Sequence, residues 1–398
     1  MTLNYLVKTA TVFLISLAIG GCQASRVDHT TSLPPALTQQ EMLALLRAGN
    51  FTELERRYSS IQRAYESHAI SDEDLRAPFR VFYSTEPDLA VQYDNWVGHS
   101  PNSYVAYLAR GIYYDFVGSE RRGGASADDT SREQFRGMEE AFQGATHDLQ
   151  KSLSLAHRPI LSYLYSIDIS RYVDSQEQTR ALFERALQVD PHSVIVREMY
   201  MVALQTAWGG SQQAMLDFLD SCRAAGLSDA ELRKLESVIA SDHAWIEFFQ
   251  EKNYLAAAKD YIHAYDLNGD SGCLRCAADA FLAAGDFNGA IDAYSRILST
   301  NPNDTYAMYR RGWLYINHQR PQDAVTDFQF AAGLGDPRGE EALARLYLTG
   351  NSVPKDRTKG IELLRAAADQ GYLPAKSLLD LVNENLFPVP TNNSPIVH

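Results

Sequence analysis

Residues 271–304 read SGCLRCAADAFLAAGDFNGAIDAYSRILSTNPND, and residues 305–338 read TYAMYRRGWLYINHQRPQDAVTDFQFAAGLGDPR. The two stretches align without a gap. Small and aromatic residues match along them: Ala278 with Gly312, Phe281 with Tyr315, Ala290 with Ala324, Tyr294 with Phe328, and Ile297 with Ala331. Small residues let one helix of a pair approach the other, and aromatic residues fill the space between pairs. The pattern predicts tandem helix pairs, with Pro302 past the end of a helix because proline lacks an N–H.

These positions resemble those that define tetratricopeptide repeats. Residues 339–374 differ in type, and they resemble a Sel1-like repeat. The matching features are Leu343, Tyr347, Gly350, the loop Val353–Asp356, Ala366-Ala367 and Gly371, whereas Ala344 stands where that family usually has glycine. A further helix from Ala375 to about Glu384 is expected to cap the array.

Less regular helix pairs are expected upstream. They lie at about 239–270, 160–191, 101–159 and 38–70. A loop at Gly118–Thr130 interrupts the third of these, and no strand-like alternation of any length occurs. We therefore expect an all-α fold, a right-handed solenoid of helix-turn-helix repeats in which each pair packs only against its neighbours.

A set of short motifs marks the N-terminal part of the chain. They are Trp96-Val97, Pro101-x-Ser103-x-x-Ala106, Ala109-Arg110-Gly111, Arg122-Gly123 and Trp208-Gly209-Gly210-Ser211. On these motifs residues 38–220 resemble an uncharacterised domain family of bacterial lipoproteins, which implies no activity. The last motif itself indicates a helix junction, because glycines permit a turn and Ser211 can N-cap the next helix. A binding role for it is the alternative.

The first 21 residues have the layout of a secretory signal. Lys8 precedes an apolar run, Thr9–Ile19, that is too short to span a bilayer. The run closes on Gly20-Gly21-Cys22, which resembles a lipobox, and this resemblance implies lipid on Cys22. Gln23 stands where aspartate would be the usual inner-membrane retention signal, so the family rule implies the periplasmic side of the outer membrane.

The expected organisation follows from these segments. It is a signal peptide at 1–21, a lipidated tether at 22–37, a helical N-terminal domain at 38–220, tetratricopeptide repeats at 221–338, a Sel1-like repeat with its capping helix at 339–387 and a loose tail at 388–398. The tether is polar and contains prolines, as linkers do.

Charge and cysteine content limit the partners. The net charge of −14 argues against nucleic acid, which requires a basic surface, and favours a basic protein partner only weakly. Cys22 is assigned to lipid and Cys222 stands alone. Cys273 and Cys276 begin a predicted helix, where an oxidising periplasm allows a disulfide and simple packing of two thiols is the alternative. A thioredoxin-like site would require a preceding strand, which is absent from the pattern.

The sequence lacks the common catalytic and metal-binding motifs. No H-E-x-x-H, G-x-S-x-G or phosphate-loop pattern occurs. Asp266-x-Asn268-x-Asp270 begins like a calcium loop, but Ser271 and Ala277 replace the required glycine and glutamate. The segment is better explained as a turn between repeats. We expect no enzyme, no metal and no cofactor, although a hydrolase with an unrecognised site stays an alternative.

A helical solenoid without catalytic residues is typical of protein-binding surfaces. Since the first helix of each tetratricopeptide pair lines the groove, the candidate binding residues are Arg275, Asp279, Tyr309 and Arg310, with solvated helix faces as the alternative.

The chain also resembles Sel1-like-repeat lipoproteins that serve as immunity proteins for type VI secretion lipase effectors. This resemblance implies that it meets a toxin in the periplasm and blocks its active site, and an acidic surface would steer capture of a basic patch. The alternative is an envelope scaffold for secretion, pilus or peptidoglycan machinery. In both cases the membrane is contacted through the lipid anchor only.

Overall fold

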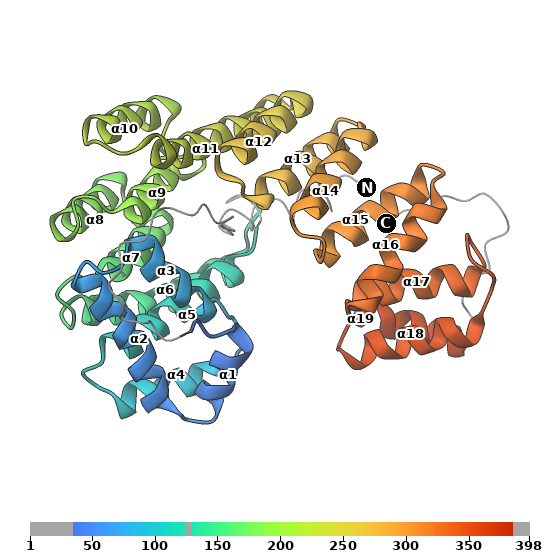
Figure 1. The fold of residues 1–398 in the computed structure, drawn as a ribbon, viewed down its shortest axis with the longest axis horizontal. Coiled ribbons are helices and arrows are strands. Elements are labelled where there is room, and N and C mark those ends of the chain that lie inside the picture. The colour runs from blue at the N-terminus through green and yellow to red at the C-terminus, as the bar shows by residue number, and fades with distance from the viewer. Residues whose placement is uncertain (1–34, 125–128, 385–398) are drawn as a thin grey trace. The chain divides into compact units, whose positions relative to one another are not determined.

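The computed structural model describes residues 35–124 and 129–384, and every regular element in these ranges is a helix (Figure 1). This confirms the predicted all-α class. The signal peptide, Cys22, the tether up to residue 34 and the predicted tail lie outside the described residues. None of the described helices is long and apolar enough to cross a membrane.

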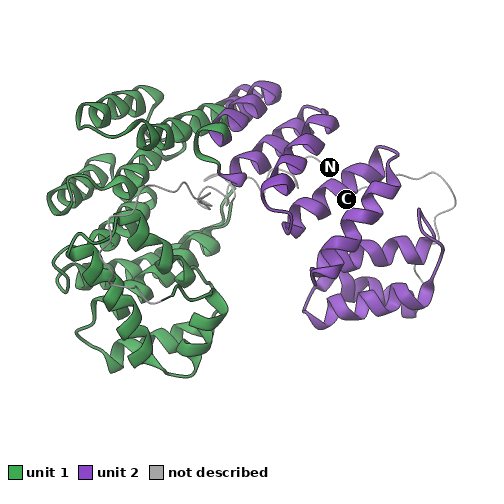
Figure 2. Ribbon diagram, in the orientation of Figure 1, with its two compact units in different colours: residues 1–246, 266–269 green, residues 247–265, 270–398 purple. Residues whose placement is uncertain are grey.

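The chain divides into two compact units, residues 1–246 with 266–269 and residues 247–265 with 270–398 (Figure 2). The first unit contains α1 (Gln39–Arg47), α2 (Phe51–Glu66), α3 (Asp72–Phe79), α4 (Leu89–His99), α5 (Tyr104–Arg122), α6 (Arg132–Leu153), α7 (Ile160–Val173), α8 (Gln176–Val189), α9 (Val194–Ala203), α10 (Gln212–Ala224) and α11 (Asp229–Ile246). The second unit contains most of α12 (Tyr254–Asn268), then α13 (Ser271–Ala283), α14 (Phe287–Thr300), α15 (Thr305–Asn317), α16 (Pro321–Gly333), α17 (Pro337–Thr349), α18 (Arg357–Asp369) and α19 (Leu373–Asn383). The predicted domain boundaries mark changes of repeat type in the sequence and stay predictions.

The second unit confirms the repeats predicted from the 34-residue alignment. Helices α13 and α14 form one pair, and α15 and α16 form the next. Gly312 on α15 lies so close to α16 that a Cβ atom there would come within 2.5 Å of the Phe328 ring. The small residue therefore permits the close approach that the sequence pattern predicted. The predicted capping helix is α19.

Helix N-termini are capped by different residues in the two units. In the second unit the N-cap residues that accept a backbone N–H are aspartates: Asp270, Asp286, Asp304, Asp336 and Asp356. In the first unit they are serines and threonine: Thr38, Ser71, Ser103, Ser131, Ser175, Ser193 and Ser211. Part of the chain's acidity is thus structural, and Asp270 closes the segment predicted as a turn between repeats.

The first unit confirms the predicted pairs at 38–70, 101–159 and 160–191 as α1–α2, α5–α6 and α7–α8. One boundary was wrong. The loop predicted to begin at Gly118 begins only after Arg122, because Gly118 is buried within α5 at a close contact with α6. A Cβ atom at Gly118 would lie 2.5 Å from the Phe142 ring.

The first unit also contains contacts between helices far apart in the sequence. The Oδ2 atom of Asp72 on α3 accepts hydrogen bonds from Ser193 Oγ at 2.7 Å and from the backbone N–H groups of Val194 at 2.7 Å and Ile195 at 3.1 Å. Asp72 thus caps α9 from more than a hundred residues away. The expectation that every pair packs only against its neighbours is wrong for this unit.

Both units contain the same type of ion pair between paired helices, which the sequence alignment did not reveal. Arg110 on α5 makes two hydrogen bonds to Asp148 on α6, at 2.6 and 2.7 Å, next to Gly111. Arg311 on α15 makes two to Asp327 on α16, at 2.9 and 2.8 Å, next to Gly312. The pair α5–α6 is therefore built like α15–α16, although a long loop separates its helices.

Candidate functional site

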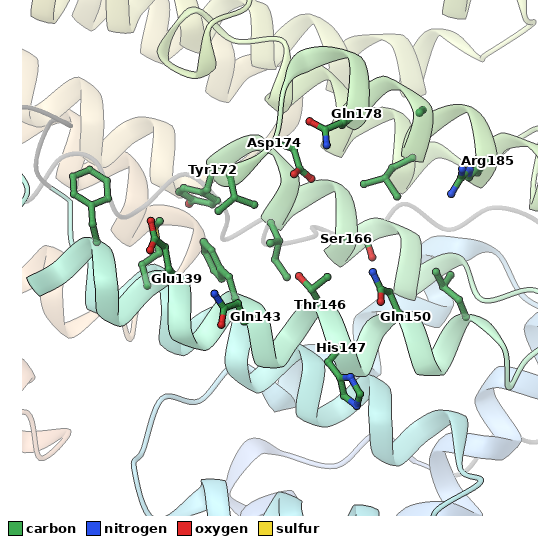
Figure 3. Close-up of a pocket in the computed structure, with 18 residues that line it drawn as sticks. Glu139, Gln143, Thr146, His147, Gln150, Ser166, Tyr172, Asp174, Gln178 and Arg185 are labelled. Carbon is green, nitrogen blue, oxygen red and sulfur yellow. The ribbon is translucent and has the colours of Figure 1, made fainter. Parts of the chain in front are cut away.

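A groove runs between α6 and α8 in the first unit, with α7 as its floor (Figure 3). We call it the α6–α8 groove, and its volume is about 950 Å³. It is lined by Phe135, Met138, Glu139, Phe142, Gln143, Thr146, His147, Gln150, Leu153, Ser166, Ile169, Tyr172, Val173, Asp174, Gln178, Ala181, Leu182 and Arg185.

The α6–α8 groove combines an apolar floor with a nearly neutral polar rim. Ile169 of α7 is buried in the floor, and Met138 and Phe142 of α6 are buried beside it. Thr146 and Gln150 point from α6 toward α7 (Figure 3), and their side chains offer both donors and acceptors. Such groups can pair with the N–H and C=O groups of an extended chain. The groove is as long as about eight extended residues, since α6 rises about 1.5 Å per residue and a strand about 3.3 Å.

A second groove lies on the other face of α8, against α9 and α10. We call it the α8–α10 groove, and its volume is about 800 Å³. Its lining is Gln176, Glu177, Arg180, Phe183, Glu184, Tyr200, Leu204, Gly209, Gly210, Ser211, Ala214, Asp217, Phe218 and Ser221. The rings of Phe183 and Tyr200 stack at 4.2 Å between centroids, and Phe218 meets both edge-on.

Gly209, Gly210 and Ser211 of the Trp208–Ser211 motif line this groove, and the motif confirms the predicted helix junction. Gly209 has a φ of 81°, and Ser211 caps α10 by accepting the N–H of Ala214 at 3.2 Å. A Cβ atom at Gly210 would lie 1.9 Å from the carbonyl oxygen of Leu204, so only glycine fits there. The Nε2 atom of Gln176 donates to the carbonyl of Trp208 at 2.9 Å and ties the junction to α8.

The other motifs of the N-terminal part also have structural positions. Trp96 is fully buried and donates to Glu55 at 2.8 Å. Ser103 accepts the N–H of Ala106, which explains their spacing, and Gly123 ends α5 with a φ of 71°. These motifs therefore stabilise the fold.

Three of the four binding residues predicted in the second unit form ion pairs within this unit. Arg310 donates to Asp279 at 3.0 Å, and this pair links α15 to α13. Arg275 donates to Asp304 at 2.5 Å. Tyr309 is half-buried, and burial raises the pKa of its hydroxyl. The contacts join successive repeats, and a binding role for these residues stays a prediction.

Cys273 and Cys276 lie in the first turns of α13, as predicted. The structure has both as thiols, and burial raises the pKa of the Cys276 thiol well above its usual value. A thiol with a raised pKa is a poor nucleophile, which does not favour redox catalysis. Their oxidation state stays a prediction.

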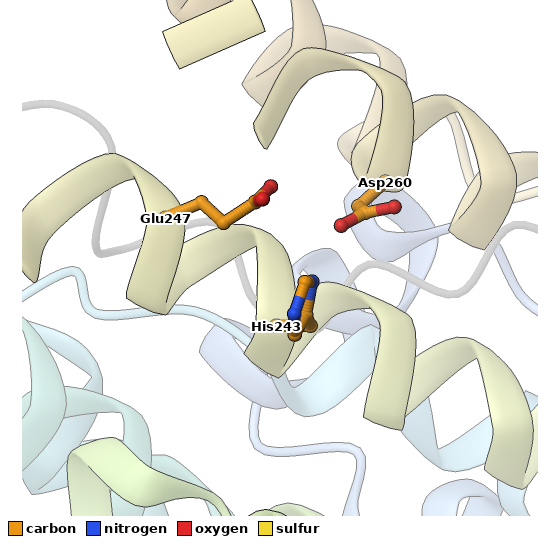
Figure 4. Close-up of side chains that lie close together, drawn as sticks. All are labelled: His243, Glu247 and Asp260. Atoms are coloured by element: carbon orange, nitrogen blue, oxygen red, sulfur yellow. The ribbon is translucent and has the colours of Figure 1, made fainter. Parts of the chain in front are cut away.

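One group of metal-ligand types was missed in the sequence. Glu247 begins the π-helical turn after α11, Asp260 lies on α12, and ligand atoms of the two are within 4.8 Å (Figure 4). His243 precedes Glu247 by one helical turn but belongs to the first unit. Because the unit boundary falls between them, the three residues make up no site within either unit. The expectation of no metal site stays a prediction.

A buried acidic pair lies near the α6–α8 groove. Asp168 on α7 pairs with Arg171 at 2.6 Å, and Arg171 lies 4.6 Å from the ring of Tyr172, which lines the groove. Asp115 on α5 is 1% exposed, and its burial, together with the charge of Asp168, raises the pKa of its carboxyl well above the usual value. Asp115 thus retains its proton where exposed carboxyls have lost theirs.

Comparison with known proteins adds a domain match and no activity. Residues 38–184 match the model of a family described as a domain of unknown function, DUF4034. No curated protein matches the chain.

Solved structures with helical repeats are distantly similar. A Sel1 repeat protein from Oxalobacter formigenes is 13% identical, with 90% of this chain and 98% of that chain covered and a TM-score of 0.35. A protective antigen with an SLR fold, present in uropathogenic Escherichia coli strains, is 17% identical, with coverages of 88% and 83% and a TM-score of 0.32. Yeast Tom70 is 14% identical, with coverages of 79% and 64% and a TM-score of 0.29. All three scores are below 0.5, so the fold described above rests on this chain's own helices.

Proposed function

We propose that this chain is a non-enzymatic protein-binding module, held at the periplasmic side of the outer membrane by lipid on Cys22. The observation that carries the binding function is the pair of grooves on the two faces of α8. The two grooves have volumes of about 950 and 800 Å³, and the lining of each mixes buried apolar residues with hydrogen-bonding groups, as the surfaces of protein interfaces do. Their polar residues show no nucleophile activated by a neighbouring base.

The anchor has its own test. Radiolabelled palmitate should enter the wild-type chain, and the chain should sediment with outer membranes. Cys22→Ser should abolish the label and release the chain into the periplasmic fraction. If the label is retained in this variant, the proposal that Cys22 is lipidated is wrong, whereas the proposed binding function is not affected.

The specific partner that we propose is a type VI secretion phospholipase effector. Co-expression of this chain with a periplasm-directed phospholipase encoded beside it should protect the cell, and the two should co-purify. Ala181→Arg places a long side chain in the α6–α8 groove from an exposed position and should abolish protection. Gln188→Arg adds the same charge at an exposed position of α8 outside both grooves and should retain it. Equal protection by both variants would place the binding surface elsewhere.

An envelope scaffold is the alternative role for the same grooves. It predicts co-purification with resident envelope proteins and an envelope defect on deletion, in cells that contain no toxin. Loss of that co-purification in Ala181→Arg would then assign the α6–α8 groove to the scaffold partner.

A further inference from the structure

The α8–α10 groove has an acidic rim over an aromatic floor. Three carboxylates line it, Glu177, Glu184 and Asp217, against one guanidinium, that of Arg180. Arg180 pairs with Glu184 at 2.8 Å along α8, and its side chain is 69% exposed. Neither Glu177 nor Asp217 has an ion-pair partner within the described ranges. The rim therefore has unneutralised negative charge.

The floor offers a partly accessible ring beside these carboxylates. Phe218 is half-buried, while Phe183 and Tyr200 are 7% and 8% exposed. Phe218 and Asp217 are neighbours on α10, and Ala214 lies one turn before Phe218. A cation in this groove can contact the π-face of a ring and a carboxylate at once.

The first unit uses the same combination internally. The guanidinium of Arg158 lies 4.2 Å from the ring centroid of Tyr65 and 2.8 Å from Asp190. Arg171 likewise lies 4.6 Å from the Tyr172 ring and pairs with Asp168. An aromatic ring beside an aspartate is thus a combination that holds arginine in this fold.

We propose that the α8–α10 groove binds an arginine side chain of the protein partner, with its guanidinium against Phe218 and paired with Asp217 and Glu184. Arginine fits better than lysine because its planar group stacks on a ring and makes two hydrogen bonds to a carboxylate. The groove is larger than one side chain, so the arginine belongs to a longer segment. This inference rests on the proposed function and names the chemistry of the partner.

The test uses a minimal probe of that chemistry. Acetyl-arginine methylamide is titrated into the full chain in the millimolar range, and the methyl signals of Ala214 and Leu204, which line the groove, are followed by NMR. Acetyl-citrulline methylamide has nearly the same shape without the charge. Arginine should shift both signals in a saturable way that salt weakens, and citrulline should not.

Variants locate the binding. Glu184→Gln combined with Asp217→Asn should weaken arginine binding by about 10-fold or more, since two charge-assisted contacts are lost. Arg180→Gln should strengthen it, because it removes the competing cation. Glu139→Gln makes the same chemical change in the α6–α8 groove and should have no effect. All these residues are exposed, and thermal melting checks that each variant folds.

Three results would overturn the inference: no shift of the groove methyl groups, equal shifts with citrulline, or arginine binding that the double variant leaves unchanged. They are distinct from a failure of the proposed function. If the effector binds the double variant as well as the wild type, the proposed function survives and the arginine site does not. If arginine binds as described but no protein partner is found, the arginine site survives and the proposed function does not.

Discussion

The two units are assembled from the same helix pairs but are stabilised in different ways. In the second unit, Ala, Gly and aromatic residues recur with the repeat, and Asp286, Asp304 and Asp336 each cap the helix that directly follows them. In the first unit, Asp72 caps a helix that lies far along the chain. A regularly repeating sequence therefore specifies contacts between helices that are neighbours in the chain. A degenerate repeat sequence also allows contacts between helices that are far apart in the chain.

The largest loss of stability is expected from breaking the Arg–Asp ion pair that the two units have in common. Asp148→Asn and Asp327→Asn each break a two-bond ion pair whose carboxylate is nearly buried, at 1% and 5% exposure. Each should lower the free energy of unfolding of its unit by about 3 to 5 kcal/mol. Hydrogen exchange read by mass spectrometry, peptide by peptide, assigns the loss to a unit.

The similarity of these two losses is itself informative. If Asp148→Asn costs less than a third of Asp327→Asn, the α5–α6 pair is not built like α15–α16, and the proposed structural equivalence of the two pairs is wrong.

The next largest loss of stability is expected from removing helix caps, and it should differ between the two units. Asp72→Ala removes three hydrogen bonds to the start of α9 and leaves buried donors unpaired, so it should cost about 3 kcal/mol. Asp286→Ala removes a local cap, which accepts only the N–H of Gly289, and should cost about 1 kcal/mol. Urea unfolding followed by circular dichroism measures both. Equal costs would mean that the distant cap contributes no more than a local one.

The contributions of Asp336 in the second unit and Asp115 in the first unit to stability should change with pH in opposite directions. Burial alone would raise the pKa of Asp336, but hydrogen bonds from Arg338, Thr305 and the backbone outweigh it and hold the pKa at about 2. This pKa is below the unfolded value of about 3.9, so its stabilisation is present above pH 4 and is lost as pH falls toward 2. Asp336→Asn should therefore cost about 2 kcal/mol at pH 7 and almost nothing at pH 2.

Asp115 in the first unit should behave in the opposite way. Its pKa is raised by burial and by the charge of Asp168, so the folded state loses stability as pH rises above the unfolded value. Asp115→Asn should leave stability unchanged at acid pH and raise it at pH 7 and above. The free energy of unfolding of both variants, measured by denaturation across the pH range, checks these two directions. If the effects of both substitutions change with pH in the same direction, the opposite pKa shifts of Asp336 and Asp115 are wrong.

The smallest effect is expected at the rim of the α8–α10 groove. Arg180 and Glu184 are 69% and 56% exposed, and exposed pairs contribute little. Arg180→Gln and Glu184→Gln should each change the free energy of unfolding by less than about 0.5 kcal/mol. A larger loss in thermal or urea unfolding would show that these residues hold the fold, and their effects on binding would then need a different explanation.

The sequence predicted what recurs or is local. The gap-free alignment placed α13 to α16, and the spacing of glycines and Ser211 placed the junction before α10. The Arg-Gly dipeptides at 110 and 311 were the available signal for the shared ion pair, but their aspartate partners follow at different separations because a loop intervenes between α5 and α6. The Asp72 cap gave no signal, since its partners are distant and neither end belongs to a motif.

The grooves were not predicted because they form where three helices meet. The prediction placed binding on the first helices of the second unit, at residues such as Arg310 and Tyr309, from their position in the repeat. The structure shows Arg310 paired with Asp279, while α8 of the first unit carries a groove on each face. Groove shape depends on how far neighbouring helices separate, and the sequence does not encode that distance locally.

Photo-crosslinking tests most directly whether the partner binds at α8. Benzoylphenylalanine replaces Arg185, an exposed long side chain that lines the α6–α8 groove, and is compared with the same residue at Tyr309 in the second unit. The chain is kept at its native level in cells that produce the neighbouring phospholipase. We expect a crosslink to the phospholipase from position 185, lost in the Glu184→Gln and Asp217→Asn double variant, and none from position 309. A crosslink from position 309 alone would contradict it.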